Sequence, residues 1–231
     1  MIALIRYELS LLLRSHRWIA PTVLFAIGVI GLGAAGPKLP LGAGLSQGLA
    51  WCALMLVPAE AWLTRSMLTA EPTEARACVA AAGGPRRTQV AALIAPGVFG
   101  AALGLLGIVW EILSLGVPRS AATNSIRLGA LFSQLGGGLA AGLICLLVGS
   151  AVAALLNPPV VRRPATAMLA TTGAVVLALA WNGSPANAAV RSVGYGSQEH
   201  TWPAGVAMAV ALVLVTVAWV ISAQVASRRA G

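Results

Sequence analysis

The sequence predicts an all-α membrane protein in which six helices span the bilayer and both termini lie in the cytoplasm. Three observations favour this fold class. The 231 residues are 58% hydrophobic and only 9% charged, whereas a soluble domain has about 25% charged residues. Six apolar runs approach the length of about 20 residues that a helix needs to cross a bilayer. The basic residues lie between these runs, and they are distributed unevenly over the two sides that the runs define.

The same composition excludes several classes of protein. So few charged side chains cannot cover the surface of an ordinary soluble enzyme, and a chain this apolar is not disordered. The net charge of +9 could suggest nucleic acid as a partner, but basic loops between apolar runs are typical of a membrane protein. We therefore expect no nucleic-acid binding, and a single transmembrane domain over residues 1–231.

The first predicted element is an interfacial amphipathic helix over residues 1–18. Its apolar side chains recur at helical spacing, and its three arginines would attract it to anionic membrane lipid. Pro21 is expected to turn the chain into the membrane. The alternative is an irregular cytoplasmic extension of the first span. The residues that form the pattern are Ile2, Ile5, Leu9, Leu12 and Leu13, with Arg6, Arg14 and Arg17.

The six predicted spans set the topology. Eleven of the fifteen basic residues fall on the side that holds both termini, which is therefore predicted to be cytoplasmic. The seven tryptophans all lie near predicted membrane boundaries, where amphipathic indole rings are favoured. The predicted spans are residues 19–36, 45–64, 90–115, 128–156, 165–182 and 203–223.

Two carboxylates, Glu60 and Glu111, lie inside predicted spans and are candidates for function, because charges in a membrane are costly. The alternative is structural. Each lies closer to a membrane interface than to the midplane, so its side chain could reach the interface or pair locally, as Glu60 could with Arg65. A proton relay is not favoured, because no further ionisable residue lies at mid-depth.

The residues needed for several enzymatic reactions are missing. The single lysine, Lys38, is not in a phosphate-binding loop, and the chain has no aspartate to hold magnesium. The two histidines, His16 and His200, lie outside the spans on opposite sides, and the three cysteines have no metal-type spacing. We expect no enzyme activity, catalytic residue, cofactor or metal site in this chain.

The longest cytoplasmic connection, residues 69–89, is predicted to contain a short helix of about three turns. Glu71 and Glu74 suit a helix N-terminus, and the alanine-rich segment after them favours a helix. Gly83-Gly84-Pro85 is a typical helix end. Arg86 and Arg87 then precede the next span. A short helix between two spans offers a surface on which another protein could act.

This layout resembles the membrane subunit of type-2 ABC exporters. That family has six spans, cytoplasmic termini, an interfacial helix before the first span and its main cytoplasmic loop after the second. The loop motif of the family is matched by Glu71-Pro72-Thr73 and by Pro85-Arg86-Arg87-Thr88-Gln89-Val90. Pro72 stands where glycine is usual, and the leucine-rich helix of the family is alanine-rich here.

The resemblance implies a function and a set of partners. Two permease chains, identical or different, would form the pathway, and two separate ATP-binding cassette ATPase subunits would bind ATP and Mg. The helix near Thr73 would couple ATP hydrolysis to export from the bacterial cytoplasmic membrane. The apolar interior suggests a hydrophobic or amphipathic substrate, such as a drug, antibiotic, peptide or lipid. The outer loop 182–202 resembles the short capping or re-entrant helices of such exporters. The residues implied in coupling are Glu71, Thr73, Glu74, Arg76, Pro85, Arg86 and Arg87.

Two other functions are consistent with the sequence. One is a six-span substrate-binding subunit of a small-molecule importer, which would not need a projecting helix in the 69–89 loop. The other is a membrane anchor or assembly protein, which would not depend on an ATPase partner. Fold resemblance alone does not decide between them.

Overall fold

The computed structural model describes residues 1–35, 41–114, 128–161, 163–194 and 202–229. Within these ranges the chain is helical and contains no strand, which confirms the predicted all-α class. The helices are α1 (Ile2–Arg14), α2 (Ile19–Ala35), α3 (Leu41–Leu68), α4 (Thr73–Gly83), α5 (Pro85–Ser114), α6 (Leu128–Leu156), α7 (Pro164–Ala180), α8 (Pro185–Gly194) and α9 (Ala204–Arg229).

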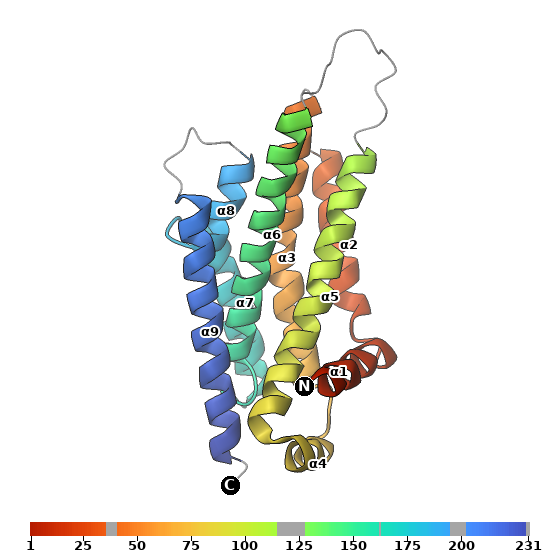
Figure 1. Ribbon diagram of the computed structural model, residues 1–231, viewed down its shortest axis with the longest axis vertical. Coiled ribbons are helices and arrows are strands. Elements are labelled where there is room, and N and C mark those ends of the chain that lie inside the picture. The colour runs from red at the N-terminus through yellow and green to blue at the C-terminus, as the bar shows by residue number, and fades with distance from the viewer. Residues whose placement is uncertain (36–40, 115–127, 162, 195–201, 230–231) are drawn as a thin grey trace.

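The long helices α3, α5, α6 and α9 and the shorter α2, α7 and α8 form an elongated bundle with α3 at its centre (Figure 1). Helix α3 packs against α2, α5, α6, α7 and α8, and α6 in turn packs against α9. The core is built mainly from alanine, leucine and valine, and α3 supplies many of its buried side chains. Small side chains let the helix backbones approach closely where lipid gives no hydrophobic drive for association.

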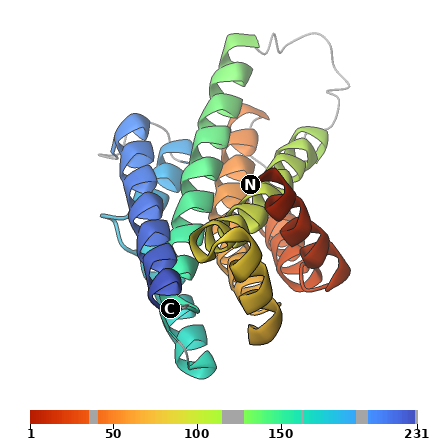
Figure 2. The ribbon, with the colours of Figure 1, turned by 60° about the horizontal axis from the view of Figure 1, so that its bottom comes forward.

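One end of the bundle carries α1, α4 and the C-terminal end of α9, and we call it the α4 end. Helices α1 and α4 lie across this end instead of running along the bundle (Figure 2). The first helix and the end of the last helix therefore lie at the same end of the bundle.

The chain turns between α1 and α2 at His16, whose φ is 56°. The predicted position of this turn, at Pro21, is wrong. Pro21 is the third residue of α2, where a missing N–H costs no helical hydrogen bond. Histidine is among the non-glycine residues that adopt positive φ more often than most.

Helix α4 ends where the sequence predicted, whereas α5 begins earlier than the predicted span. Gly84 follows α4 with φ 84°, and its N–H donates to the carbonyl of Ala80. A glycine reaches this conformation without steric cost. Pro85 then starts α5, where its fixed φ suits the first helical turn. Helix α5 thus begins five residues before the predicted span at residue 90, so Arg86 and Arg87 belong to its first turn.

Within the described ranges, three helices are long and apolar enough to cross a membrane, namely Pro85–Ser114, Leu131–Leu156 and Ala204–Arg228. Helices α7 and α8 meet at 45°, and together they would give a fourth crossing. The described apolar part of α2, Ile19–Gly31, is short for a span. Helix α3 is 28 residues long, but its polar side chains lower its mean hydropathy. A membrane protein is indicated, and six spans stay a prediction.

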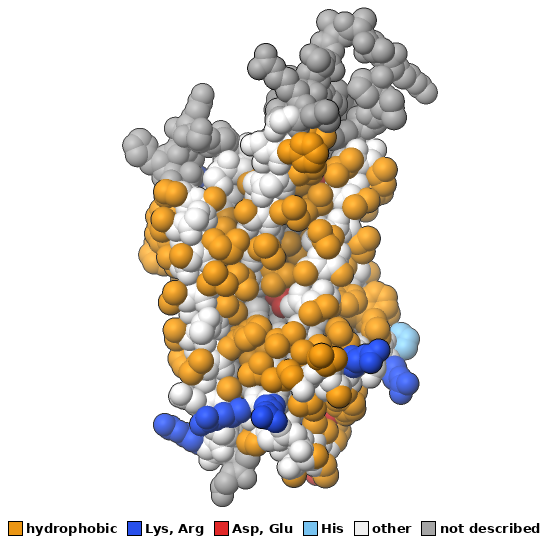
Figure 3. Space-filling view, in the orientation of Figure 1, with side chains coloured by type: hydrophobic (Ala, Val, Ile, Leu, Met, Phe, Trp, Pro, Cys, Tyr) orange, Lys and Arg blue, Asp and Glu red, His pale blue; other side chains and the backbone are white. Residues whose placement is uncertain are grey.

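The surface agrees with a bilayer environment. Apolar side chains cover the middle of the face shown in Figure 3, and arginines gather towards the α4 end. Large exposed hydrophobic side chains occur on α2, α5, α7 and α9, including Ile27, Leu106, Leu169 and Val213, each more than 60% exposed. Such a belt would be costly in water and is expected in contact with lipid.

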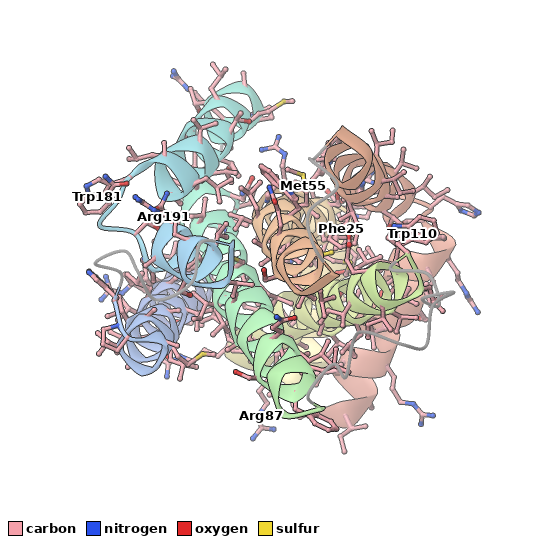
Figure 4. The ribbon with its side chains drawn as sticks, turned by 90° about the horizontal axis from the view of Figure 1, so that it is seen from above. Phe25, Met55, Arg87, Trp110, Trp181 and Arg191 are labelled. Atoms are coloured by element: carbon pink, nitrogen blue, oxygen red, sulfur yellow. The ribbon has the colours of Figure 1, made fainter. Side chains whose placement is uncertain are left out.

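Helix α8 lies within the predicted outer loop 182–202, at the end opposite α4 (Figure 1). Its buried face packs against α3, α6, α7 and α9. Seen from this end, Arg191 and the exposed Trp181 lie towards the outside of the bundle, whereas Phe25 and Met55 lie between α2 and α3 (Figure 4). Residues 195–201 of the loop are outside the described part of the chain.

Candidate functional site

Arg76 attaches α4 to the bundle. Its guanidinium donates to the carbonyl oxygen of Leu68 at 2.9 Å and to Oε1 of Gln89 at 3.0 Å. The amide of Gln89 donates to Oγ of Ser222 at 2.8 Å. Burial lowers the pKa of Arg76, and the carboxylates of Glu8 and Glu71 act in the opposite direction. One chain of hydrogen bonds therefore links α4 through α5 to α9.

A second contact links α4 to α1. The Tyr7 hydroxyl donates to Oε1 of Glu71, which raises the pKa of Tyr7 to about 12. Glu8 is only 3% exposed, and burial raises its pKa to about 7. The Glu71 carboxylate adds to this shift, and Arg76 opposes it. At the same junction, Leu4 approaches Gly83, the last residue of α4. We call Tyr7, Glu8, Glu71, Arg76, Gln89 and Ser222 the α4 cluster.

The remaining residues predicted for coupling lie on or beside α4. Thr73 starts α4, and its side chain is outside the described part of the structure. Glu74 is exposed in the first turn of α4. Pro85 lines a cleft of about 460 Å³ between α4, α5 and α9. Arg86 and Arg87 are exposed, and Arg87 extends outward (Figure 4). The structure thus brings Glu71, Arg76 and Pro85 together, but not the two arginines of α5.

Glu60 is buried inside the bundle on α3 and is 0% exposed. Its Oε1 accepts a hydrogen bond of 3.1 Å from Thr64, and its Oε2 has no hydrogen-bond partner. Glycines surround it. A Cβ at Gly100 would overlap Oε2, and a Cβ at Gly149 would lie 3.1 Å from the Cβ of Glu60. The carboxyl occupies space that exists only because α5 has no side chain at Gly100, and Gly149 lets α6 approach the backbone of α3 beside it.

Of the structural alternative for Glu60, the local partner is present but is Thr64, whereas pairing with Arg65 and extension to the interface are wrong. Arg65 donates instead to Asn157 Oδ1 at 2.9 Å and to the carbonyl of Pro164 at 3.2 Å. Residues four apart share a helix face and residues five apart do not, so Glu60 contacts Thr64 and not Arg65. Full burial also rules out a side chain that extends to the membrane surface.

Glu111 lies on α5 towards the opposite end and is 8% exposed. Its Oε1 accepts a weak hydrogen bond from Cys52 Sγ at 3.9 Å, and a Cβ at Gly48 would overlap Oε2. Like Glu60, it points towards α3–α5 packing that depends on a glycine. Cys52 and Glu60 are eight residues apart on α3, or about 12 Å along the helix.

An apolar pocket of about 150 Å³ lies between α3, α5 and α6. Its walls include three glycines and six leucines, and little of its surface is polar. Figure 3 shows an acidic side chain in a hollow of the apolar face. Cys52, which contacts Glu111, lines the pocket. Leu146 lines it too, and Leu146 approaches Gly100 beside Glu60. The carboxyl groups of Glu111 and Glu60 therefore lie next to two side chains that line the pocket, Cys52 and Leu146.

Sequence reasoning missed four members of the α4 cluster, namely Tyr7, Glu8, Gln89 and Ser222. Glu8 had a signal, since it is the one acidic residue within the amphipathic segment 1–18. Gln89 and Ser222 are separated by 133 positions, and a single sequence gives no sign that they meet. Asn157 and Thr171, which are joined by a buried hydrogen bond of 3.2 Å, were missed for the same reason.

Among the described residues, no group of three or more His, Cys, Asp or Glu side chains could hold a metal ion. Comparison with known proteins gives no family assignment. No family model matches the sequence, no curated protein matches it, and no solved structure matches the fold.

Proposed function

We propose that this chain is the permease subunit of an ATP-driven exporter in the bacterial cytoplasmic membrane. It would pair with a second permease chain and with two separate ATP-binding cassette ATPase subunits, which would hold ATP and Mg. Its substrate would be hydrophobic or amphipathic. In this proposal the α4 end faces the cytoplasm, and α4 is the coupling helix.

The observation that carries the proposal is the attachment of α4. A helix that transmits force must be fixed to the moving parts on one side and free for a partner on the other. The Arg76–Gln89–Ser222 hydrogen bonds fix α4 to α5 and α9, and the Tyr7–Glu71 bond fixes the segment just before α4 to α1. A displacement of α4 would therefore move two long helices together.

The outer side of α4 suits a protein partner. Apart from Glu74, the exposed side chains on this side are small, namely Ala75, Cys78, Ala81 and Ala82. Small side chains allow close approach of a second backbone and lose little conformational entropy when they are covered. An importer's binding subunit, the first alternative, would not need this projecting helix.

The test is affinity purification of the chain from its native host in mild detergent, with identification of the proteins that accompany it. We expect stoichiometric recovery of a P-loop ATPase. Ala81→Arg places a long cation on the exposed side of α4 without touching the α4 cluster, and it should abolish this recovery. Ala165→Arg, at an exposed position of α7 near the same end, is the matched control and should retain it.

Two results would overturn the proposal. One is the absence of any ATPase from the purified wild-type complex. The other is equal ATPase recovery with Ala81→Arg and with Ala165→Arg, which would show that α4 is not the docking helix.

A further inference from the structure

The buried carboxyl of Glu60 lacks the partner that its location demands. An isolated carboxylate in an apolar interior is strongly disfavoured, so such a group holds a proton or meets a cation. Oε2 has no hydrogen-bond partner, and the Thr64 hydroxyl reaches only Oε1. The nearest arginine in sequence, Arg65, is engaged by Asn157 and Pro164. The fold therefore keeps a hydrogen-bond acceptor open inside the bundle.

The surroundings of Glu60 differ from ordinary packing. Gly97, Gly100 and Gly149 surround the side chain from two other helices, and any larger residue at 100 would displace the carboxyl. The carboxyl therefore occupies the position that a side chain at residue 100 would take. Glycine offers no side-chain donor to Oε2, so this close packing leaves the oxygen without a hydrogen-bond partner.

The apolar pocket between α3, α5 and α6 lies next to this carboxyl. Ala101 and Gly104, on the same helix as Gly100, line the pocket, and so does Leu146. A Cβ at Gly100 would lie 3.3 Å from Leu146 Cδ1 and would overlap Glu60 Oε2. Leu146 is therefore the side chain that borders both the pocket and the carboxyl. Glu111 lies behind Cys52 on another wall of the pocket.

We propose that this pocket binds a cationic amphiphile, with the apolar part between the glycine-lined walls of α5 and α6 and an ammonium group on Glu60. Binding requires Leu146 to move aside and the carboxyl to be ionised. The ammonium then supplies both the missing counter-charge and a hydrogen bond to Oε2. Neutral or anionic amphiphiles of the same length fill the walls but leave the carboxyl unpaired.

This inference narrows the substrate class of the proposed exporter to amphiphilic cations. It is tested on the purified chain alone, in lipid nanodiscs, by equilibrium binding of radiolabelled decylammonium with empty nanodiscs as the background. Decanol and decanoate are the neutral and anionic probes. Because no ATPase is present, failure of the exporter proposal and failure of this one are distinguishable.

We expect saturable binding of decylammonium, with decanol and decanoate about tenfold weaker or more. Glu60→Gln keeps the shape of the side chain and should weaken decylammonium binding about tenfold or more. It should leave decanol binding unchanged. Glu74→Gln removes the same charge at an exposed position on α4, outside the pocket, and should bind decylammonium like the wild type.

A second pair of variants keeps the test independent of the fold around Glu60. Gly142→Leu fills the pocket from α6, where a Cβ meets only Leu56 at 3.5 Å, and it should abolish binding. Gly136→Leu, on the same helix with open space around it, should bind normally. Wild-type affinity in Glu60→Gln or in Gly142→Leu would overturn the proposal. So would equal binding of all three probes, or no saturable binding of decylammonium to the wild-type chain.

Discussion

The α4 cluster and the surroundings of Glu60 differ in how far their buried polar groups are hydrogen-bonded. At the α4 end, Arg76, Gln89 and Ser222 form a continuous series of hydrogen bonds, and Tyr7 pairs with Glu71. Around Glu60 the helices leave side chains out, and one carboxyl oxygen stays unpaired. A cluster whose hydrogen bonds are formed is suited to hold α4 on the bundle, whereas a buried group without a hydrogen-bond partner indicates a ligand site.

The largest effect that separates the two regions is expected at Gly149. An added Cβ would lie 2.7 Å from the backbone oxygen of Val57, and a backbone atom cannot move aside as a side chain can. Gly149→Ala should therefore lower stability by about 3 kcal/mol. The measurement is thermal unfolding in detergent, followed by size-exclusion chromatography.

Gly173→Ala is the matched control, because nothing lies within 4 Å of its Cβ position on α7. It should raise stability by about 0.5–1 kcal/mol through the helix preference of alanine. Equal effects of the two substitutions would mean that the α3–α6 contact does not depend on a missing side chain.

Loss of the Arg76 hydrogen bonds at the α4 end should have the next largest effect on the free energy of unfolding. Arg76→Ala leaves Gln89 Oε1 and the Leu68 carbonyl without their donor, and the free energy of unfolding should fall by about 2 kcal/mol. Arg87→Ala removes an exposed arginine, and its effect should stay within about 0.5 kcal/mol. Limited proteolysis of residues 69–85 would detect the release of α4. Protection of this segment in Arg76→Ala would contradict the role of Arg76 as its anchor.

The α4 cluster should also respond to pH through Glu8. Its pKa of about 7 lies above the ordinary value of 4.5, so the folded state binds this proton more tightly than the unfolded state does. The corresponding stability is fully present below about pH 4.5 and is lost as the pH rises through 7. The loss should be about 1–2 kcal/mol, because detachment of α1 would let water reach the carboxylate and limit the cost.

Glu8→Gln should remove this dependence and make the protein more stable than the wild type at pH 8. Unfolding curves for both proteins between pH 4.5 and pH 8 measure the difference. Parallel pH profiles would show that Glu8 is not the titrating group.

The smallest expected effect is at the far end of the same hydrogen-bond chain. Ser222→Ala leaves one Gln89 N–H without its acceptor and should cost about 1 kcal/mol. A double-mutant cycle with Arg76→Ala would sharpen the comparison, because residues in one network should show a coupling energy of at least about 0.5 kcal/mol. Strict additivity would mean that α4 and α9 are not linked through Gln89.

The sequence predicted much of the fold correctly. The apolar runs marked the long helices, and Gly83-Gly84-Pro85 marked the boundary between α4 and α5. The turn before α2 was misplaced because Pro21 is tolerated in a first helical turn, and His16 carries no strong turn signal. Of the candidate site, Glu71, Arg76 and Glu60 were named from sequence, but their partners were not.

The sequence by itself determined the helical class, the apolar surface and the positions of the charges, because these follow from composition and local periodicity. Only the tertiary structure decided which charges are paired. Arg76 meets Gln89, Arg65 meets Asn157, and Glu60 is left with Thr64 alone. The physical reason is that pairing depends on which helix faces meet, and Gly100 and Gly149 set this by allowing α5 and α6 to approach α3.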